Sequence, residues 1–132
     1  MTFPYLQYGD FYRPIVPVTF MVGGQSLAYE ALVDTGADYS VVDRELGRAL
    51  GMSFEHAPAV EVAGIAGTTK GHIVPTDLAI GPLTFKQVPI IFADLGPRSL
   101  GILGHAGLFD RLRLVVEFSR REFQIIAVRS KQ

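Results

Sequence analysis

Apolar residues recur in short runs along this chain, and each run is bounded by glycine, proline or polar residues. The segments IVPVTFMV (15–22) and SLAYEALV (26–33) flank Gly23-Gly24-Gln25. Glycine supplies the positive φ angles of tight hairpin turns, so this arrangement predicts two antiparallel strands joined by a short turn. Runs of this length with this punctuation are typical of β-strands rather than of helices.

Further strand pairs of the same kind are predicted along the rest of the chain. They lie at 60–62 with 69–74, on either side of Gly81-Pro82 within 76–93, and in a closing hairpin at 113–128. Two segments break the pattern. The stretch 41–52 predicts a short helix with Asp43 as N-cap, and 105–112 predicts one or two helical turns. The predicted fold class is all-β with one or two short helices.

The composition narrows the class of protein without identifying it. The 132 residues suffice for a single domain spanning 1–132, with 48% apolar residues and a formal net charge of −1. This balance argues against a nucleic-acid-binding surface or a polybasic membrane surface. The chain has no cysteine, and its three histidines lack the spacing of metal ligands, so no metal or cofactor is implied.

Targeting and membrane signals are also absent from the sequence. The first residues, MTFPYLQYGDFYRP, have neither the basic start nor the apolar core of a signal peptide. No apolar run approaches the length of a membrane span. We therefore expect a cytoplasmic protein that has no membrane partner.

The strongest candidate for chemistry is Asp34, which follows the apolar strand 26–33 and begins the tripeptide Asp-Thr-Gly. At average residue usage this tripeptide occurs by chance in roughly three chains in a hundred of this length, so alone it is weak evidence. Aspartate before glycine also commonly ends a strand in an Asx turn, which is the structural alternative. Three features favour a chemical role: DTGAD (34–38), the glycine-rich hairpin AGIAGTTKG (63–71), and GILGHAGLF (101–109).

This combination resembles the retropepsins, the single-domain aspartic proteases of retroviruses and their cellular relatives. The likeness spans nearly the whole chain. The stretch 13–38 is similar to their N-terminal half, 63–71 to the tip of their flap, and ILG (102–104) to the segment that threads behind their catalytic loop. The resemblance implies a retropepsin-like acid-protease half-barrel that works as a two-fold homodimer on polypeptide substrates.

The chemistry of such an enzyme explains why one aspartate is insufficient. Two carboxylates that share one proton act as a base, which activates a water, and an acid, which protonates the carbonyl oxygen of the scissile bond. No other aspartate of the chain stands in an Asp-Thr-Gly or Asp-Ser-Gly setting. We therefore expect the partner of Asp34 to be Asp34 of a second copy, and the substrate to be an extended, mainly apolar segment.

The resemblance also assigns roles to the residues that follow Asp34. Thr35 is expected to hydrogen-bond across the dimer axis, and Gly36 to let the chain approach the substrate. Ala37 is expected to form a small subsite wall, and Asp38 to bind the main chain of the substrate. For Asp38 the alternative is a solvated loop acid.

The predicted flap tip comprises Gly64, Ile65 and Ala66, whose backbone N–H groups are expected to cover a bound peptide. The same glycine-rich segment does not fit a phosphate-binding loop, because the order Gly-x-x-x-x-Gly-Lys-Ser/Thr is absent. Further subsite walls are expected at Val62, Ile65 and either Ile90 or Ile91.

Three questions stay open on the sequence alone. A catalytically silent retropepsin-fold dimer that binds a peptide or serves as a scaffold is the alternative function. His105 follows ILG where the retroviral enzymes usually carry an arginine, so it either pairs with Asp38 or faces solvent at a helix start. Finally, we expect the C-terminal hairpin to supply more of the dimer interface than the first ten residues.

Overall fold

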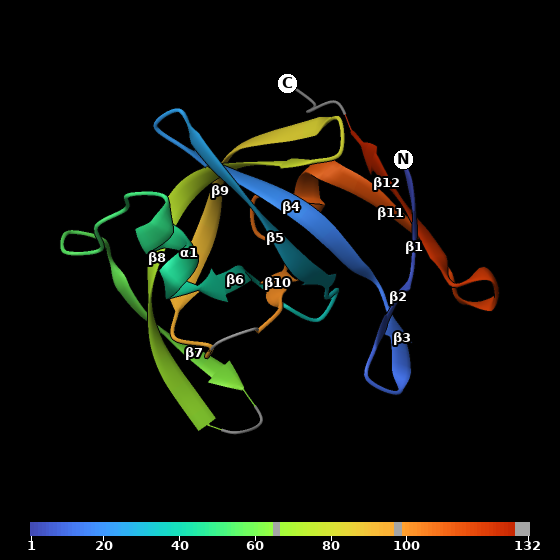
Figure 1. The fold of residues 1–132 in the computed structure, drawn as a ribbon, viewed down its shortest axis with the longest axis horizontal. Helices are drawn as coiled ribbons and strands as arrows, with labels where there is room; N and C mark the ends of the chain where they lie inside the picture. The colour runs from blue at the N-terminus through green and yellow to red at the C-terminus, as the bar shows by residue number, and fades with distance from the viewer. Residues whose placement is uncertain (65–66, 97–98, 129–132) are drawn as a thin grey trace.

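The computed structural model describes residues 1–64, 67–96 and 99–128 (Figure 1). Its strands, in chain order, are β1 (Thr2–Pro4), β2 (Leu6–Tyr8), β3 (Phe11–Arg13), β4 (Ile15–Val22), β5 (Gln25–Val33), β6 (Ser40–Asp43), β7 (Ala59–Gly64), β8 (Gly67–Ile80), β9 (Leu83–Ala93), β10 (Gly101–Leu103), β11 (Leu112–Glu117) and β12 (Glu122–Ala127). A short helix, α1 (Arg44–Ala49), follows β6, and two 3₁₀ turns, η1 (Phe109–Arg111) and η2 (Phe118–Arg120), flank β11.

The body of the molecule is a closed ring of strands. The order of pairing is β4-β5-β10-β6-β9-β8, and β8 returns to pair with β4, while β7 extends outward from β8 (Figure 1). Side chains inside the ring form the main core, and full burial of each large apolar side chain contributes about 1.5–3 kcal/mol. The largest of these buried side chains include Phe20, Leu78, Ile80, Ile90, Phe92, Leu103 and Leu108.

The ring closes where β8 bends at a β-bulge. Two residues of β9, Lys86 and Gln87, lie opposite Asp77 alone, and a bulge of this kind bends and twists its strand. From this point β8 also pairs with β4, with Met21 opposite Asp77. The Asp77 carboxylate holds the bulge, because its Oδ1 accepts the backbone N–H of Gln87 at 2.9 Å and its Oδ2 lies 3.4 Å from Lys86 Nζ.

The two ends of the chain form a separate three-stranded sheet in the order β1-β12-β11. Phe3 of β1 stacks on Phe123 of β12 with ring centroids 5.4 Å apart, and both rings are buried. The N-terminal strand is therefore part of this chain's own core. Removing the first eight residues would damage that core, so such a deletion would not report on a dimer interface alone.

A small hairpin that the sequence analysis did not predict precedes the ring. Strands β2 and β3 pair with each other around Gly9, whose φ is +65°, and with no other strand among the described residues. Its residues alternate poorly between apolar and polar, because aromatic side chains stand on its exposed faces. Aromatic residues favour strands without marking a buried face, so the alternation of polar and apolar residues could not find this hairpin.

The predicted all-β class and its main hairpins are confirmed, and so is the short helix with Asp43 as its N-cap. Val41 and Val42 lie buried in β6, because the helix begins only after Asp43, whose side chain accepts the N–H of Glu45. In the stretch 105–112, where one or two helical turns were predicted, a turn with Gly107 at a φ of +68° is followed by the single 3₁₀ turn η1. The strand predicted at 69–74 is part of the longer β8.

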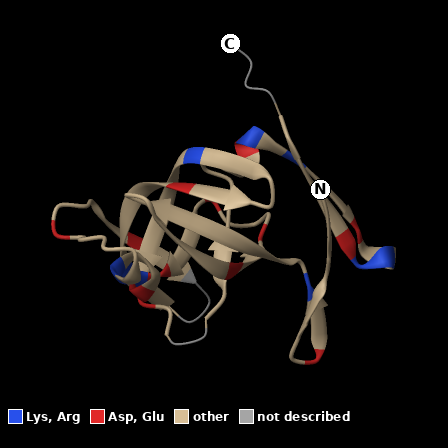
Figure 2. Ribbon diagram, turned by 45° about the horizontal axis from the view of Figure 1, so that its top comes forward, with Lys and Arg blue, Asp and Glu red and all other residues tan. Residues whose placement is uncertain are grey.

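Charges of both signs are interspersed along the described ribbon, as Figure 2 shows. Within the described ranges, no helix has the length and apolar character needed to cross a bilayer. The expected cytoplasmic location and the expected lack of a nucleic-acid partner stay predictions.

Thermal unfolding at a series of pH values tests the role of Asp77. The backbone N–H of Gln87, and then Lys86, hold the pKa of the Asp77 carboxyl below its usual value. A carboxyl whose pKa is lower in the folded state stabilises the protein above the unfolded pKa, and this contribution is lost as the pH falls through the folded pKa. We expect Asp77→Asn to lower Tm at pH 7 and to approach wild type below about pH 4.

The control for this series is Glu55→Gln, which removes an exposed carboxylate from the loop after α1. It should follow wild type across the whole pH range. If the Tm difference between Asp77→Asn and wild type is the same at pH 7 and at pH 3, the charged form of Asp77 does not stabilise the bulge.

Candidate functional site

Asp34 lies just beyond β5 and begins a tight turn. Its N–H donates to the carbonyl of Leu103 at 3.1 Å, and its own carbonyl accepts the N–H of Ala37 at 3.1 Å. Its Oδ1 accepts the N–H of Gly36 at 2.9 Å, which makes this the Asx turn that the sequence left open. The second oxygen, Oδ2, makes no hydrogen bond within the described part of the chain, and the residue is half-buried.

The turn is supported from behind by β10, which lies between β5 and β6. It pairs in parallel with β5 and antiparallel with β6, so the segment ILG passes behind the loop that joins those two strands. Gly104 touches the loop so closely that a Cβ there would lie 2.5 Å from the carbonyl oxygen of Tyr39 and 2.8 Å from that of Ala37. Its N–H donates to the buried hydroxyl of Ser40 at 2.9 Å. Only glycine permits this approach.

His105 continues the same support. Its N–H donates to the carbonyl of Ala37 at 3.0 Å, and its ring nitrogen Nε2 lies 2.6 Å from the carbonyl oxygen of Thr35. A carbonyl oxygen only accepts, so Nε2 carries the proton in this contact. The ring also meets the edge of Phe109, with centroids 5.3 Å apart. His105 therefore clamps the turn that carries Asp34.

His105 is exposed, as one of the two sequence-based alternatives expected, but neither alternative foresaw the contact that its ring makes. The ring reaches the carbonyl of Thr35 and does not pair with the carboxylate of Asp38, although Ala106 donates its N–H to the Asp38 carbonyl at 2.8 Å. Among the described residues, no cation forms an ion pair with Asp38. His105 therefore lies beside the backbone of Asp38, as one alternative expected, but the ion pair between the two side chains does not form.

A groove of about 590 Å³ opens along the turn. Its floor comes from the turn after β5, one wall comes from β7, and apolar side chains of β6, β9 and β10 complete it. The lining residues are Asp34, Gly36, Ala37, Asp38, Tyr39, Val41, Glu61, Val62, Ala63, Ile91 and Ile102.

The β7–β8 hairpin borders this groove at the position expected for a flap. The two strands pair as far as Gly64 opposite Gly67, and the predicted tip residues Ile65 and Ala66 lie outside the described residues. Val62 packs against the small cluster that contains Val41 and Ile91. The base of the hairpin is therefore fixed beside the groove by apolar contacts.

The structure gathers most of the residues that the sequence proposed. Of the turn residues, all but Thr35 line the groove, and Thr35 itself is exposed beside it. Of the two isoleucines offered as a subsite wall, Ile91 faces the groove and Ile90 lies in the core.

Sequence reasoning missed several lining residues from other elements. Val41 was missed because no strand was predicted before the helix, although its position in a β-branched pair gave a signal for one. Ile102 belongs to the ILG segment, next to Leu103, which is fully buried in the core. Because successive residues of a strand face opposite sides, the sequence could have shown that Ile102 faces away from the core. The remaining residues missed are Tyr39, Glu61 and Ala63.

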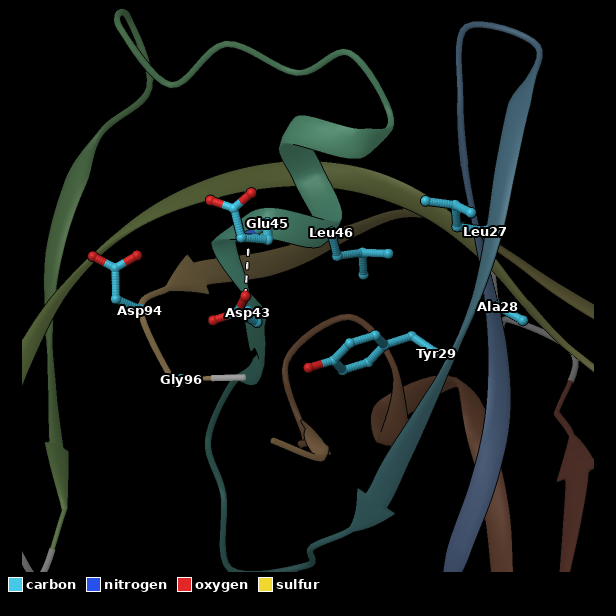
Figure 3. Close-up of a pocket in the computed structure, with 8 residues that line it drawn as sticks. All are labelled: Leu27, Ala28, Tyr29, Asp43, Glu45, Leu46, Asp94 and Gly96. Carbon is cyan, nitrogen blue, oxygen red and sulfur yellow. Dashed lines mark hydrogen bonds between the residues drawn. The ribbon is translucent and has the colours of Figure 1, made fainter. Parts of the chain in front are cut away.

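A second hollow, of about 620 Å³, lies between β5, the start of α1 and the segment after β9 (Figure 3). Both oxygens of Asp43 accept backbone N–H groups there, Asp94 pairs with Arg44 at 3.0 Å, and the hydroxyl of Tyr29 donates to the carbonyl of Ser99 at 2.5 Å. Burial, and then the Asp43 carboxylate, raise the pKa of Tyr29. The polar side chains of this hollow are therefore engaged in contacts that stabilise the fold.

The two hollows differ in the chemistry that they offer. The one in Figure 3 is slightly larger, yet it contains no residue of the Asp34 turn. No group of three or more His, Asp or Glu side chains among the described residues is placed to hold a metal ion. The groove beside Asp34, with a carboxylate oxygen left unbonded, is the better candidate for a reaction.

Comparison with models of known protein families gives a match. A family model described as aspartyl protease matches residues 16–106, a range that contains the Asp34 turn, the β7–β8 hairpin and the ILG segment. No curated protein matches the chain.

Substitution of His105 tests the clamp. His105→Leu removes the donor to Thr35, and a lost hydrogen bond of this kind costs about 1 kcal/mol, which corresponds to a fall in Tm of roughly 3–5 °C. We also expect faster amide hydrogen exchange at Asp34 and Gly36. His105→Gln places an amide N–H near the position of Nε2, so it should recover part of both effects.

The control for the clamp is the same pair of changes at His56, an exposed histidine in the loop after α1. Neither should alter exchange in the turn. If His105→Gln behaves as His105→Leu does in both measurements, the hydrogen bond to Thr35 is not what holds the turn.

Proposed function

The chain belongs to the aspartyl protease family, and from this premise we propose that it is an aspartic endopeptidase that works as a homodimer. Each subunit contributes Asp34, and the two carboxylates share one proton and one water. The substrate is an extended polypeptide with mainly apolar side chains. No cofactor enters the reaction.

The observation that carries this proposal is the state of the Asp34 carboxylate. One oxygen is oriented by the N–H of Gly36, and the other makes no hydrogen bond within the described part of the chain, at the floor of a groove. A carboxylate fixed in this way can accept a proton from water. The other acids that line the groove, Asp38 and Glu61, stand in different settings: Asp38 is exposed on the loop, and Glu61 is exposed on β7.

The shape of the turn supports a site shared by two subunits. Thr35 and Gly36 are exposed at the turn, whereas the residues behind them are held by β10. A turn that is rigid and exposed can meet its own copy across a two-fold axis. Two carboxylates brought close in this way cannot both ionise easily, so one keeps a proton and acts as the acid.

The proposed reaction uses only these two groups and water. The ionised Asp34 takes a proton from the water, and the oxygen of that water attacks the carbonyl carbon of the substrate. At the same time the protonated Asp34 of the other subunit gives its proton to the carbonyl oxygen. The resulting diol collapses as the C–N bond breaks: the protonated Asp34 gives its proton to the leaving nitrogen, and a diol hydroxyl gives its proton to the ionised Asp34 of the other subunit. Both carboxyl groups return to one proton between them.

The apolar walls of the groove favour the proposed substrate. Val41, Val62, Ile91 and Ile102 line it, and an extended peptide would lie between the turn and the β7–β8 hairpin with side chains alternating into these walls. Asp38 lines the groove, and its carboxylate is proposed to accept main-chain N–H groups of the substrate. Gly64, Ile65 and Ala66 are proposed to cover the peptide from the hairpin side.

Substitution of Asp34 tests the mechanism. Asp34→Asn keeps an oxygen that can accept the N–H of Gly36, so Tm should change little. It removes the proton exchange, so cleavage of casein at pH 4–6, a range typical of carboxylate pairs, should fall by at least about 10³-fold, the scale for loss of acid–base catalysis. A hydroxyl-bearing inhibitor of the pepstatin type should inhibit wild type.

Two comparisons sharpen this test. Glu55→Gln, which changes an exposed acid in the loop after α1, should cleave as wild type does. Specific activity of wild type should fall on dilution, because the site exists only in the dimer. Cleavage that survives in Asp34→Asn rules out the mechanism, and a dimer that binds casein without cutting it would support a binding module instead.

A further inference from the structure

The hairpin formed by β2 and β3, residues 6–13, exposes an unusual amount of aromatic surface, and we call it the aromatic arm. Tyr8 is 48% exposed, Phe11 65% and Tyr12 45%, and the neighbouring Phe118 of η2 is 77% exposed. Single exposed apolar residues are ordinary in proteins, but a contiguous patch of rings marks a surface that another molecule covers.

Contacts within the chain hold the arm in place without covering it. The guanidinium of Arg121 lies over the ring of Tyr12, 4.0 Å from its centroid, and that of Arg13 lies 5.7 Å from the centroid of Phe11. The N–H of Tyr5 donates to the carbonyl of Arg121 at 2.7 Å. A two-stranded hairpin by itself is marginally stable in water. The arm is therefore positioned by this chain and leaves its outer rings available.

The base of the arm lies next to the Asp34 turn. The arm leads through Pro14 into β4, and the carbonyl of Pro14 accepts the N–H of Val33, the last residue of β5, at 2.8 Å. In Figure 1 the arm projects from the end of the ring at which β5 ends. Any molecule that approaches the exposed Thr35 along a two-fold axis therefore meets the arm as well.

The size of a stable interface supports this conclusion. A standard interface covers about 800 Å² on each partner, which is roughly 16 Å in radius if it is circular. Phe11 lies three residues from Pro14, a reach of at most about 10 Å. The base of the arm is then inside a footprint centred on Thr35, and its rings reach toward the rim.

We propose that the aromatic arm packs against the partner subunit of the dimer, with Phe11 as its anchor. The inference rests on the two-fold arrangement of the proposed function. It adds residues 6–13 to an interface for which the sequence favoured the C-terminal hairpin. The arm and its surroundings carry charges of both signs, with Asp10 at its tip and Arg13 at its base, so a second copy offers complementary partners.

The experiment compares Phe11→Ala with Leu27→Ala by sedimentation of the full chain over a dilution series. Leu27 is also an exposed apolar residue, but it lies on β5 seven positions before Asp34, toward the opposite end of that strand. Loss of one anchoring ring weakens association about tenfold, and a two-fold interface contains it twice, so we expect Phe11→Ala to raise the dimer Kd about 100-fold. Leu27→Ala should leave it unchanged.

A second variant and an activity measurement separate the possible outcomes. Phe11→Leu keeps an apolar anchor and should stay within a few-fold of wild type, and far-UV circular dichroism checks that each variant is folded. At concentrations where Phe11→Ala is fully dimeric, its specific activity should equal that of wild type. An unchanged dimer Kd in Phe11→Ala, or a wild type that stays monomeric, overturns the proposal, as does a change confined to substrate KM.

These outcomes are distinct from those of the proposed function. If Phe11→Ala weakens the dimer but no variant or wild type cleaves peptide, the arm is right and the protease mechanism is wrong. If cleavage depends on Asp34 and on protein concentration while Phe11 has no effect on the dimer Kd, the mechanism stands and the arm serves another partner.

Discussion

The position of Asp34 depends on one close backbone contact, the passage of Gly104 behind the loop between β5 and β6. No side chain larger than hydrogen fits there, because the carbonyl oxygens of Tyr39 and Ala37 lie where a Cβ would be. This contact determines how closely β10 packs against the loop between β5 and β6, and it therefore positions the end of β5. The same strand, β10, brings Ile102 to the wall of the groove.

Much of this arrangement could be predicted from the sequence, and the failures have physical causes. Hairpins with glycine turns are local, so 15–33 and the turn at Gly81 follow from the pattern of residues alone. The strand of Val41 and Val42 was not predicted because its pairing partners, β9 and β10, are distant in sequence. The pairing of strands that are distant in sequence also determines which elements line the groove, and the local pattern of apolar and polar residues does not reveal that pairing.

The same reasoning explains why the Asp-Thr-Gly turn could not settle its own function. The Asx turn between Asp34 and Gly36 forms whether or not the carboxylate reacts, so both readings of the sequence predicted the same local geometry. What separates them is the surroundings: a groove on one side, a clamp of backbone contacts on the other, and an unbonded carboxylate oxygen between. These are tertiary features, and they favour chemistry over simple strand termination.

Acid conditions impose a last constraint on this design. A carboxylate pair that shares a proton works where carboxylates elsewhere begin to protonate, so structural contacts that need an ionised carboxylate of ordinary pKa weaken there. The supports of the Asp34 turn do not depend on such charges. Leu103 and Ala37 accept through carbonyls, Ser40 accepts through a hydroxyl, and His105 donates from Nε2 whether its ring is neutral or protonated. The frame of Asp34 is therefore built from hydrogen bonds that need no ionised carboxylate as a partner.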